Sequence, residues 1–88
     1  MDELILRLLR ADLNIQTDKR DEYLKTLVRG ARDLISREGI CLQDTYEDAM
    51  LTEMYAAYLY RKRKENVAMP QMLRWALNNR ILGENNDD

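Results

Sequence analysis

The sequence contains no histidine and only one cysteine among its 88 residues. Without histidine there is no His-based nucleophile, general base or zinc site, and Cys41 alone cannot form a thiolate metal cluster. Cys41 also cannot form an intrachain disulfide, which favours a reducing compartment. An enzyme using carboxylates alone would need a buried, pKa-shifted acid pair, which sequence does not reveal. We therefore expect no enzyme and no cofactor or metal site.

Long apolar runs are also missing. The longest stretch without a charged residue is residues 66–73, far below the roughly 20 apolar residues of a membrane-spanning helix. The chain starts with acidic residues after Met1, unlike the basic start of a secretory signal. We expect a protein made in the cytoplasm that has no contact with a membrane.

One proline and three glycines are the only strong helix breakers. The apolar residues recur at i, i+3, i+4 and i+7, which is typical of amphipathic helices. The sequence therefore predicts an all-α up-down bundle of four helices, forming a single domain over residues 1–88. We place the helices at residues 2–13, 19–38, 44–64 and 70–83, with residues 84–88 as a frayed tail.

Capping preferences indicate where the helices begin and end. Asp18 is the expected N-cap of the second helix, and Gly39 lies where a left-handed residue would end it. Either Asp44 or Thr45 is expected to cap the third helix. Gly30 lies inside the second helix, where glycine costs about 1 kcal/mol relative to alanine, so we expect another helix to approach closely there.

The third helix carries an apolar run, residues 54–60, that points in every direction around the helix axis. A small monomer has few residues with which to surround it. Two interpretations are open: the tyrosines reach water at the edge of the core, or the run forms a subunit interface. Tyr55 and Tyr58 are the interface candidates on this helix.

The fourth helix has two apolar sides. Leu73 and Leu77 lie on one side, whereas Trp75 and Leu82, seven residues apart, lie on another. Because tryptophan is enriched at interface hot spots, we expect Trp75 and Leu82 to face a neighbouring subunit. Packing at the edge of the monomer's own core is the alternative.

Seven basic residues form two candidate groups for contact with phosphate or an acidic partner. They are Lys25, Arg29 and Arg32 on the second helix and Arg61, Lys62, Arg63 and Lys64 at the end of the third. Exposed helix faces and the helix dipole explain both groups without a ligand. The formal net charge is −2, whereas a dedicated duplex-binding domain presents a strongly basic face. No aromatic residues alternate with the bases to mark a single-strand platform, so we expect no sequence-specific DNA binding.

Several segments, taken in their order and spacing, resemble one known family. They are residues 9–13 (LRADL), 21–24 (DEYL), the small residue Ala31, 54–61 (MYAAYLYR), 69–74 (MPQMLR) and 76–80 (ALNNR). In nearly its whole length the chain is similar to the small head–tail connector proteins, also called head-completion or adaptor proteins, of long-tailed bacteriophages and prophages.

This resemblance implies a structural virion protein with no catalytic role. Such proteins are helical bundles that assemble as a ring beneath the portal, where they link the capsid to the tail around the DNA channel. The implied partners are other copies of the chain, the portal protein, the next tail-side component and DNA that passes without sequence specificity. The implied location is the head–tail interface of the virion. The alternative is a small helical nucleic-acid-binding regulator that uses the seven basic residues.

Overall fold

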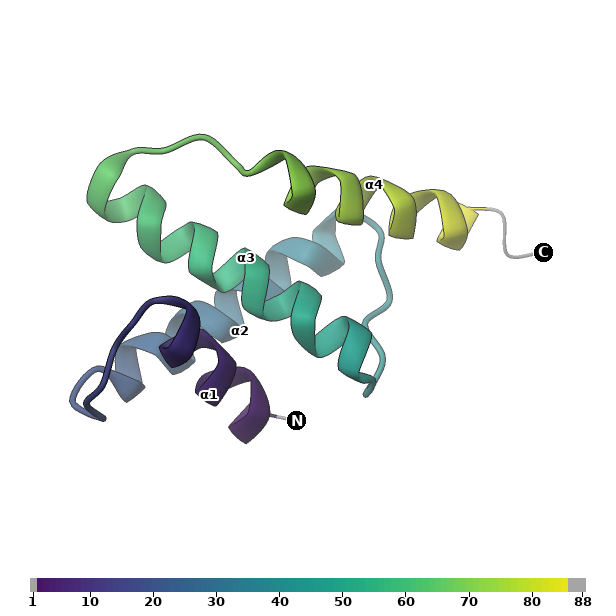
Figure 1. The fold of residues 1–88 in the computed structure, drawn as a ribbon. Coiled ribbons are helices and arrows are strands. Elements are labelled where there is room, and N and C mark those ends of the chain that lie inside the picture. Colours follow the sequence, from purple (N-terminus) through teal and green to yellow (C-terminus); the bar gives the residue numbers. More distant parts are fainter. Residues whose placement is uncertain (1, 86–88) are drawn as a thin grey trace.

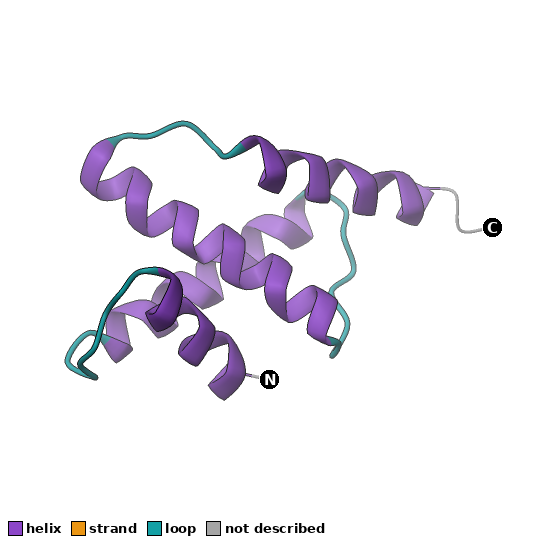
Figure 2. Cartoon of the chain, viewed as in Figure 1, coloured by secondary structure: helices purple, strands orange, loops and turns teal. Residues whose placement is uncertain are grey.

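A computed structural model describes residues 2–85, in which all the regular structure is helical (Figures 1 and 2). The helices are α1 (Asp2–Asp12), α2 (Asp21–Arg37), α3 (Tyr46–Glu65) and α4 (Gln71–Asn85). This confirms the predicted all-α bundle of four helices. α1 and α2 pack against α3 and against each other, and α4 packs against α3 on the side opposite α1 (Figure 1).

The central helix α3 is buried around most of its circumference because the other three helices contact it. Within the apolar run, the buried residues are Tyr55, Ala56, Ala57, Tyr58 and Tyr60. Met54 and Leu59 are half-buried at the edge of the same core. The folded monomer therefore covers this run with its own helices, which favours the first of the two interpretations over a subunit interface.

The amphipathic pattern of α2 matches its packing. One side is buried, consisting of Leu24, Val28, Ala31 and Ile35. The helix ends at Arg37, and Gly39 follows with a φ of +96°, which confirms the predicted left-handed residue.

The start of α2 differs from the prediction. The helix begins at Asp21, and Arg20 occupies the N-cap position without a side-chain capping bond. The Asp18 carbonyl instead accepts a hydrogen bond from the Asp21 backbone N–H at 3.1 Å. The prediction that Asp18 caps the helix is wrong because a turn separates it from the first helical residue.

Both ends of α3 are capped. The Thr45 Oγ1 accepts a hydrogen bond from the Asp48 backbone N–H at 3.2 Å, so Thr45, and not Asp44, is the N-cap. At the other end Asn66 has a left-handed φ of 54°, and its N–H donates to the Lys62 carbonyl at 2.8 Å. These caps fix the length of the helix around which the others pack.

α4 is longer than predicted. It begins at Gln71, directly after Pro70, and continues past Gly83 to Asn85. The prediction that residues 84 and 85 belong to a frayed tail is therefore wrong, and residues 86–88 lie outside the described residues. A carboxylate oxygen of Glu84 lies 3.3 Å from the Arg80 guanidinium one turn earlier, and such a pair supports the last turn.

The carboxylate of Asp48 joins the loop before α3 to α4. Asp48 is 3% exposed, and its Oδ2 accepts a hydrogen bond from the Gln43 backbone N–H at 2.6 Å. Its Oδ1 pairs with the Arg80 guanidinium, which also donates to the Cys41 carbonyl at 3.1 Å. Every partner of this carboxylate would lose an acceptor if it were removed.

Gly30 lies in open surroundings. No atom lies within 4 Å of the position that a Cβ would occupy there. The predicted close approach of another helix is therefore wrong, and the glycine only weakens α2.

We predict that Asp48→Ala lowers the free energy of unfolding by about 3 kcal/mol, because it leaves the Arg80 guanidinium without its buried partner. Urea denaturation measures this change. Glu47→Ala is the matched control, since Glu47 is an exposed acid next in sequence and should change stability by no more than about 0.5 kcal/mol. Equal effects of the two substitutions would contradict the role given to Asp48.

We predict that Gly30→Ala raises the free energy of unfolding by about 0.5–1 kcal/mol, because alanine favours the helix and its methyl group has space. Gly39→Ala should lower it by about 1–2 kcal/mol, because the left-handed φ disfavours a Cβ. Thermal melting of both variants tests the pair. A loss of stability in Gly30→Ala would show that this part of α2 is closely packed.

Candidate functional site

The outward side of α4 presents three large apolar side chains to solvent. Met72 is 71% exposed, Trp75 57% and Leu82 59%. On the opposite side of the helix, Leu73 and Leu77 are fully buried. We call Met72, Trp75 and Leu82 the α4 ridge. The structure places Trp75 and Leu82 away from the monomer's core, and their contact with a neighbour stays a prediction.

A groove of about 420 Å³ lies between α3 and α4. Its apolar lining includes Met50, Met54 and Ala76, and Met50 is 57% exposed. Methionine side chains adapt to the shape of what they contact. Ala76 is adjacent in sequence to Trp75, so the groove and the α4 ridge occupy neighbouring parts of the surface.

Tyr55 and Tyr58 do not belong to this exposed surface. They are 7% and 8% exposed, and their rings pack edge to face with centroids 6.0 Å apart. Burial raises the pKa of Tyr55, and the nearby Glu38 carboxylate adds to the effect. The prediction that these tyrosines supply an interface is wrong for the folded monomer, because its own helices cover them.

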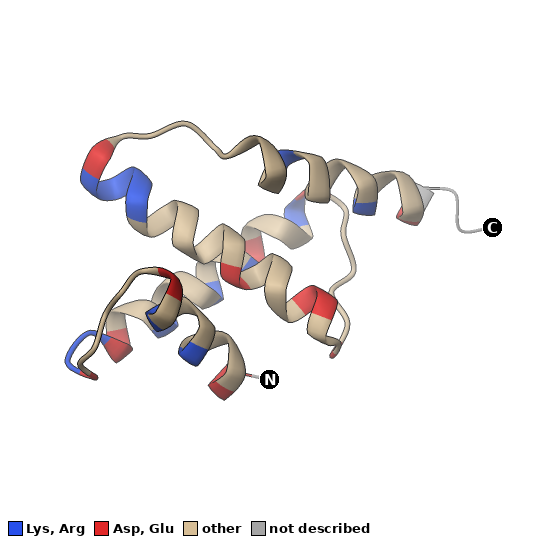
Figure 3. Cartoon of the chain, in the orientation of Figure 1, with Lys and Arg blue, Asp and Glu red and all other residues tan. Residues whose placement is uncertain are grey.

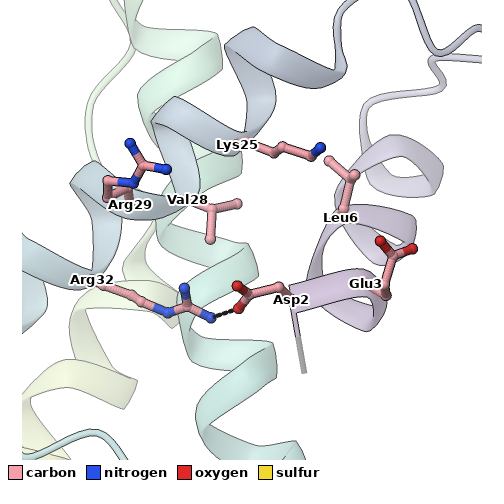
Figure 4. A pocket seen from close by; sticks show the side chains of 7 residues that line it. All are labelled: Asp2, Glu3, Leu6, Lys25, Val28, Arg29 and Arg32. Atoms are coloured by element: carbon pink, nitrogen blue, oxygen red, sulfur yellow. Dashed lines mark hydrogen bonds and ion pairs between the residues drawn. The ribbon is translucent and has the colours of Figure 1, made fainter.

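The basic residues of α2 lie in a concavity of about 330 Å³ between α1 and α2 (Figure 4). Lys25, Arg29 and Arg32 share its lining with the acids Asp2 and Glu3. Arg32 pairs with Asp2 across the concavity, and the hydrogen bond and charge of Arg32 lower the pKa of the Asp2 carboxyl. The negative charge of these acids offsets the positive electrostatic potential that would attract a phosphate.

The four consecutive bases at the end of α3 have different surroundings. The Arg61 guanidinium lies 3.0 Å from the Asp12 carboxylate at the end of α1. The Lys62 ammonium lies 5.6 Å from the centre of the Tyr58 ring. Arg63 and Lys64 instead line a third concavity, so the structure does not bring the four bases together as one group.

This third concavity contains residues that sequence reasoning missed. Arg20, Tyr23 and Tyr60 line it together with Arg63 and Lys64. The spacing of Tyr60, Arg63 and Lys64 at i, i+3 and i+4 places them on one side of α3 and could have been noticed. The contribution of Arg20 and Tyr23 follows only from the packing of α2 against α3.

A buried carboxyl on α3 faces the end of α1. Glu53 is 9% exposed, and its Oε2 atom has no hydrogen-bond partner. Burial raises the pKa of Glu53 to about 8, and the hydrogen bond and negative charge of Asp12 contribute, whereas Arg61 opposes the rise. The pKa of Asp12 is lowered, first by its hydrogen bond with Glu53. A protonated Glu53 can donate to the ionised Asp12.

Glu53 has the burial and the raised pKa that a carboxylate-only enzyme would need, whereas its partner Asp12 is exposed. The three concavities described above are lined by other residues. The Arg61 guanidinium already donates hydrogen bonds to Asp12. They reach the Asp12 carboxylate at 3.0 Å and the Asp12 backbone carbonyl at 3.3 Å. The arrangement is explained by the docking of α1 on α3.

No protein-family model matches the chain, and neither a curated protein nor a solved structure shows significant similarity to it. Among residues 2–85, no helix is long and apolar enough to cross a membrane, and no cluster of acids and cysteine could hold a metal ion. The resemblance to connector proteins therefore stays a prediction.

We predict that the free energy of unfolding falls as pH rises from about 4.5 to about 8. In this window the unfolded chain releases the Glu53 proton while the folded chain keeps it, because the folded pKa is raised to about 8. Glu53→Gln keeps a donor to Asp12 but does not titrate. Its urea denaturation should depend less on pH over the same window.

Glu47→Gln is the matched control for this experiment, since Glu47 is exposed on the same helix. It should retain the pH dependence of the unchanged protein. An identical dependence in Glu53→Gln would contradict a raised pKa for Glu53.

Proposed function

We propose that this protein is a structural virion protein, a head–tail connector (adaptor) subunit that assembles as a ring beneath the phage portal. In this role it links the capsid to the tail around the channel through which DNA passes. It would be made in the cytoplasm of the bacterial host and would end at the head–tail interface of the virion. The resemblance of the sequence segments to that family supports the proposal.

The observation that carries the assembly role is the α4 ridge. Its three side chains are each more than half exposed, although the opposite side of the same helix completes the core. Apolar side chains exposed on the same side of one helix are the kind of surface that interaction sites use. A protein that only needed α4 to close its core could carry polar residues at these positions.

The ridge and the groove together offer two surfaces through which subunits can contact one another. We expect the ridge of one subunit to pack into the α3–α4 groove of the next, with Trp75 against Met50 and Met54. A contact between two different surfaces is heterologous, and repeated heterologous contacts close into a ring when the rotation permits. The portal protein and the next tail-side component would then bind the two faces of that ring.

A small nucleic-acid-binding regulator is the second candidate, and the bases that converge at the end of α3 favour it. The two candidates differ in selectivity. A regulator should bind one duplex more tightly than another at physiological salt. A connector subunit that lines a DNA channel should bind all sequences equally and weakly. Fluorescence anisotropy with several unrelated duplexes distinguishes them.

We predict that the protein self-associates at high concentration or on its portal, and that Trp75→Ala weakens this assembly by about 2 kcal/mol or more. The same substitution should leave the helical content and most of the stability of the monomer intact, because the side chain is 57% exposed. Light scattering over a concentration series, with and without the portal protein of the same phage genome, measures assembly.

Two controls bracket this result. Leu77→Ala removes a fully buried side chain of the same helix and should cost about 2–5 kcal/mol of folding stability. Leu8→Ala removes an apolar side chain that is 37% exposed on α1 and should leave assembly unchanged. A large loss of folding stability in Trp75→Ala would overturn the proposal. So would monomeric behaviour of the unchanged protein both with and without the portal protein.

A further inference from the structure

Three cationic side chains and two phenols converge where the start of α2 meets the end of α3. Arg20 precedes α2, Tyr23 lies in its first turn, and Tyr60, Arg63 and Lys64 belong to the last turns of α3. They line a concavity of about 390 Å³. Figure 3 shows the cluster of bases at this end of α3, opposite the acids at its start. We call these five residues the α3-end cation site.

The side chains of this site hold one another in place. Arg20 donates a hydrogen bond to the Tyr60 hydroxyl, and Arg63 donates to the Tyr23 hydroxyl at 3.3 Å. The Arg63 guanidinium also lies 5.4 Å from the centre of the Tyr23 ring, and the Lys64 ammonium lies 5.0 Å from that of Tyr60. Cations held over aromatic rings lose part of their freedom before any ligand arrives.

No carboxylate of residues 2–85 forms an ion pair with a cation of the site. The lining contains no carboxylate, and none of Arg20, Arg63 and Lys64 takes part in the ion pairs of residues 2–85. Asp21, adjacent in sequence, pairs with Arg10 at 3.6 Å. The site therefore differs from the α1–α2 concavity, where acids accompany the bases.

The Tyr60 hydroxyl reports the same field. Its pKa is lowered, first by a hydrogen bond from Lys64 and then by the charges of Arg20 and Lys64. Because the surroundings favour the ionised form of this hydroxyl, they should also favour other anions at the same position. The geometry of the three cations, rather than this shift, defines the site.

The helix dipole does not account for this arrangement. Bases in the last turn of α3 interact favourably with its C-terminal carbonyl groups, which explains Arg63 and Lys64. Arg20 lies before α2 and adds a third like charge, which repels Arg63 and Lys64, and the acids that follow it in sequence, Asp21 and Glu22, do not line the concavity. An anionic ligand removes that repulsion.

We infer that the α3-end cation site binds the phosphodiester backbone of a nucleic acid. Arginine, lysine and tyrosine hydroxyl groups are common donors to backbone phosphates. The concavity exceeds what one phosphate needs, and regularly spaced phosphates of a strand can engage the three cations in turn. The acidic side chains of a peptide have no such fixed spacing, and for this reason nucleic acid is favoured over an acidic protein.

The site contacts the backbone and not the bases. One face of each tyrosine ring is occupied by a cation, and the two rings pack against each other with centroids 6.1 Å apart. Because a cation already covers one face of each ring, we expect base stacking to contribute little and binding to be independent of sequence. The α4 ridge takes no part in the site, so this inference and the assembly proposal can fail separately.

The test is a titration of the ¹⁵N-labelled protein with a short oligothymidylate and with an abasic deoxyribose-phosphate strand of the same length. Both strands should shift the amide signals of Tyr23, Tyr60 and Lys64. The two strands should also bind with equal affinity. With three cations engaged, log K should fall against log salt with a slope of about −2, since each contact on a single strand contributes about −0.7. Polyglutamate and inorganic phosphate are the comparison ligands.

The variant Arg63→Gln/Lys64→Gln should weaken binding of both strands about tenfold and reduce the salt slope to about −0.7, because one cation remains. Lys25→Gln/Arg29→Gln is the matched control, since it removes the same charge from the α1–α2 concavity. It should leave the slope unchanged. Tyr60→Phe, which keeps the ring but removes the hydroxyl, should weaken binding while preserving the melt.

Each other result overturns the inference. Equal losses of affinity in the two double variants would mean that general charge attraction, and not this site, binds the strands. Binding of polyglutamate as tightly as of the abasic strand would assign the site to an acidic protein partner. A strong preference for oligothymidylate over the abasic strand would mean base recognition, and a response to inorganic phosphate alone would mean a small-anion site.

Discussion

The burial of α3 around most of its circumference is the constraint on which the rest of the structure depends. A helix that is apolar in every direction is stable in water only when other elements cover it on every side. α1, α2 and α4 each provide part of that cover, and together they bury a run that includes three tyrosines. The order of the helices and the side of each that is apolar follow from this requirement.

The same constraint explains why the buried acids lie on α3. Glu47 is exposed at the start of α3, but Asp48 and Glu53 lie in its buried part, so each of these two acids needs its own way to tolerate burial. Arg80 and a backbone N–H satisfy both oxygens of the Asp48 carboxylate. Glu53 lacks an equivalent cation of its own, and its raised pKa keeps it neutral at moderate pH. The two residues represent the two ways in which a carboxyl can tolerate burial.

Relations within one helix were predictable from the sequence, and relations between helices were not. The spacing of Trp75 and Leu82 against Leu73 and Leu77 indicated correctly which side of α4 is buried. The same reasoning failed for Tyr55 and Tyr58, because the periodicity of one helix does not tell how many neighbours surround it. The pairing of Arg20 with Tyr60 joins residues 40 apart in sequence, and no local pattern encodes such a contact.

The attachment of α4 has a consequence for how the molecule opens. Its packing is mainly against α3 alone, whereas α1 and α2 also contact each other, so α4 can separate by breaking one principal interface and the ion pairs of Arg74 and Arg80. Cooperative units that share fewer contacts open at lower free energy than the whole domain. We therefore expect backbone amides of α4 to exchange through local opening, and those at the centre of α3 through global unfolding. The helix that carries Met72, Trp75 and Leu82 on its exposed side is thus also the one that should detach at the lowest free energy.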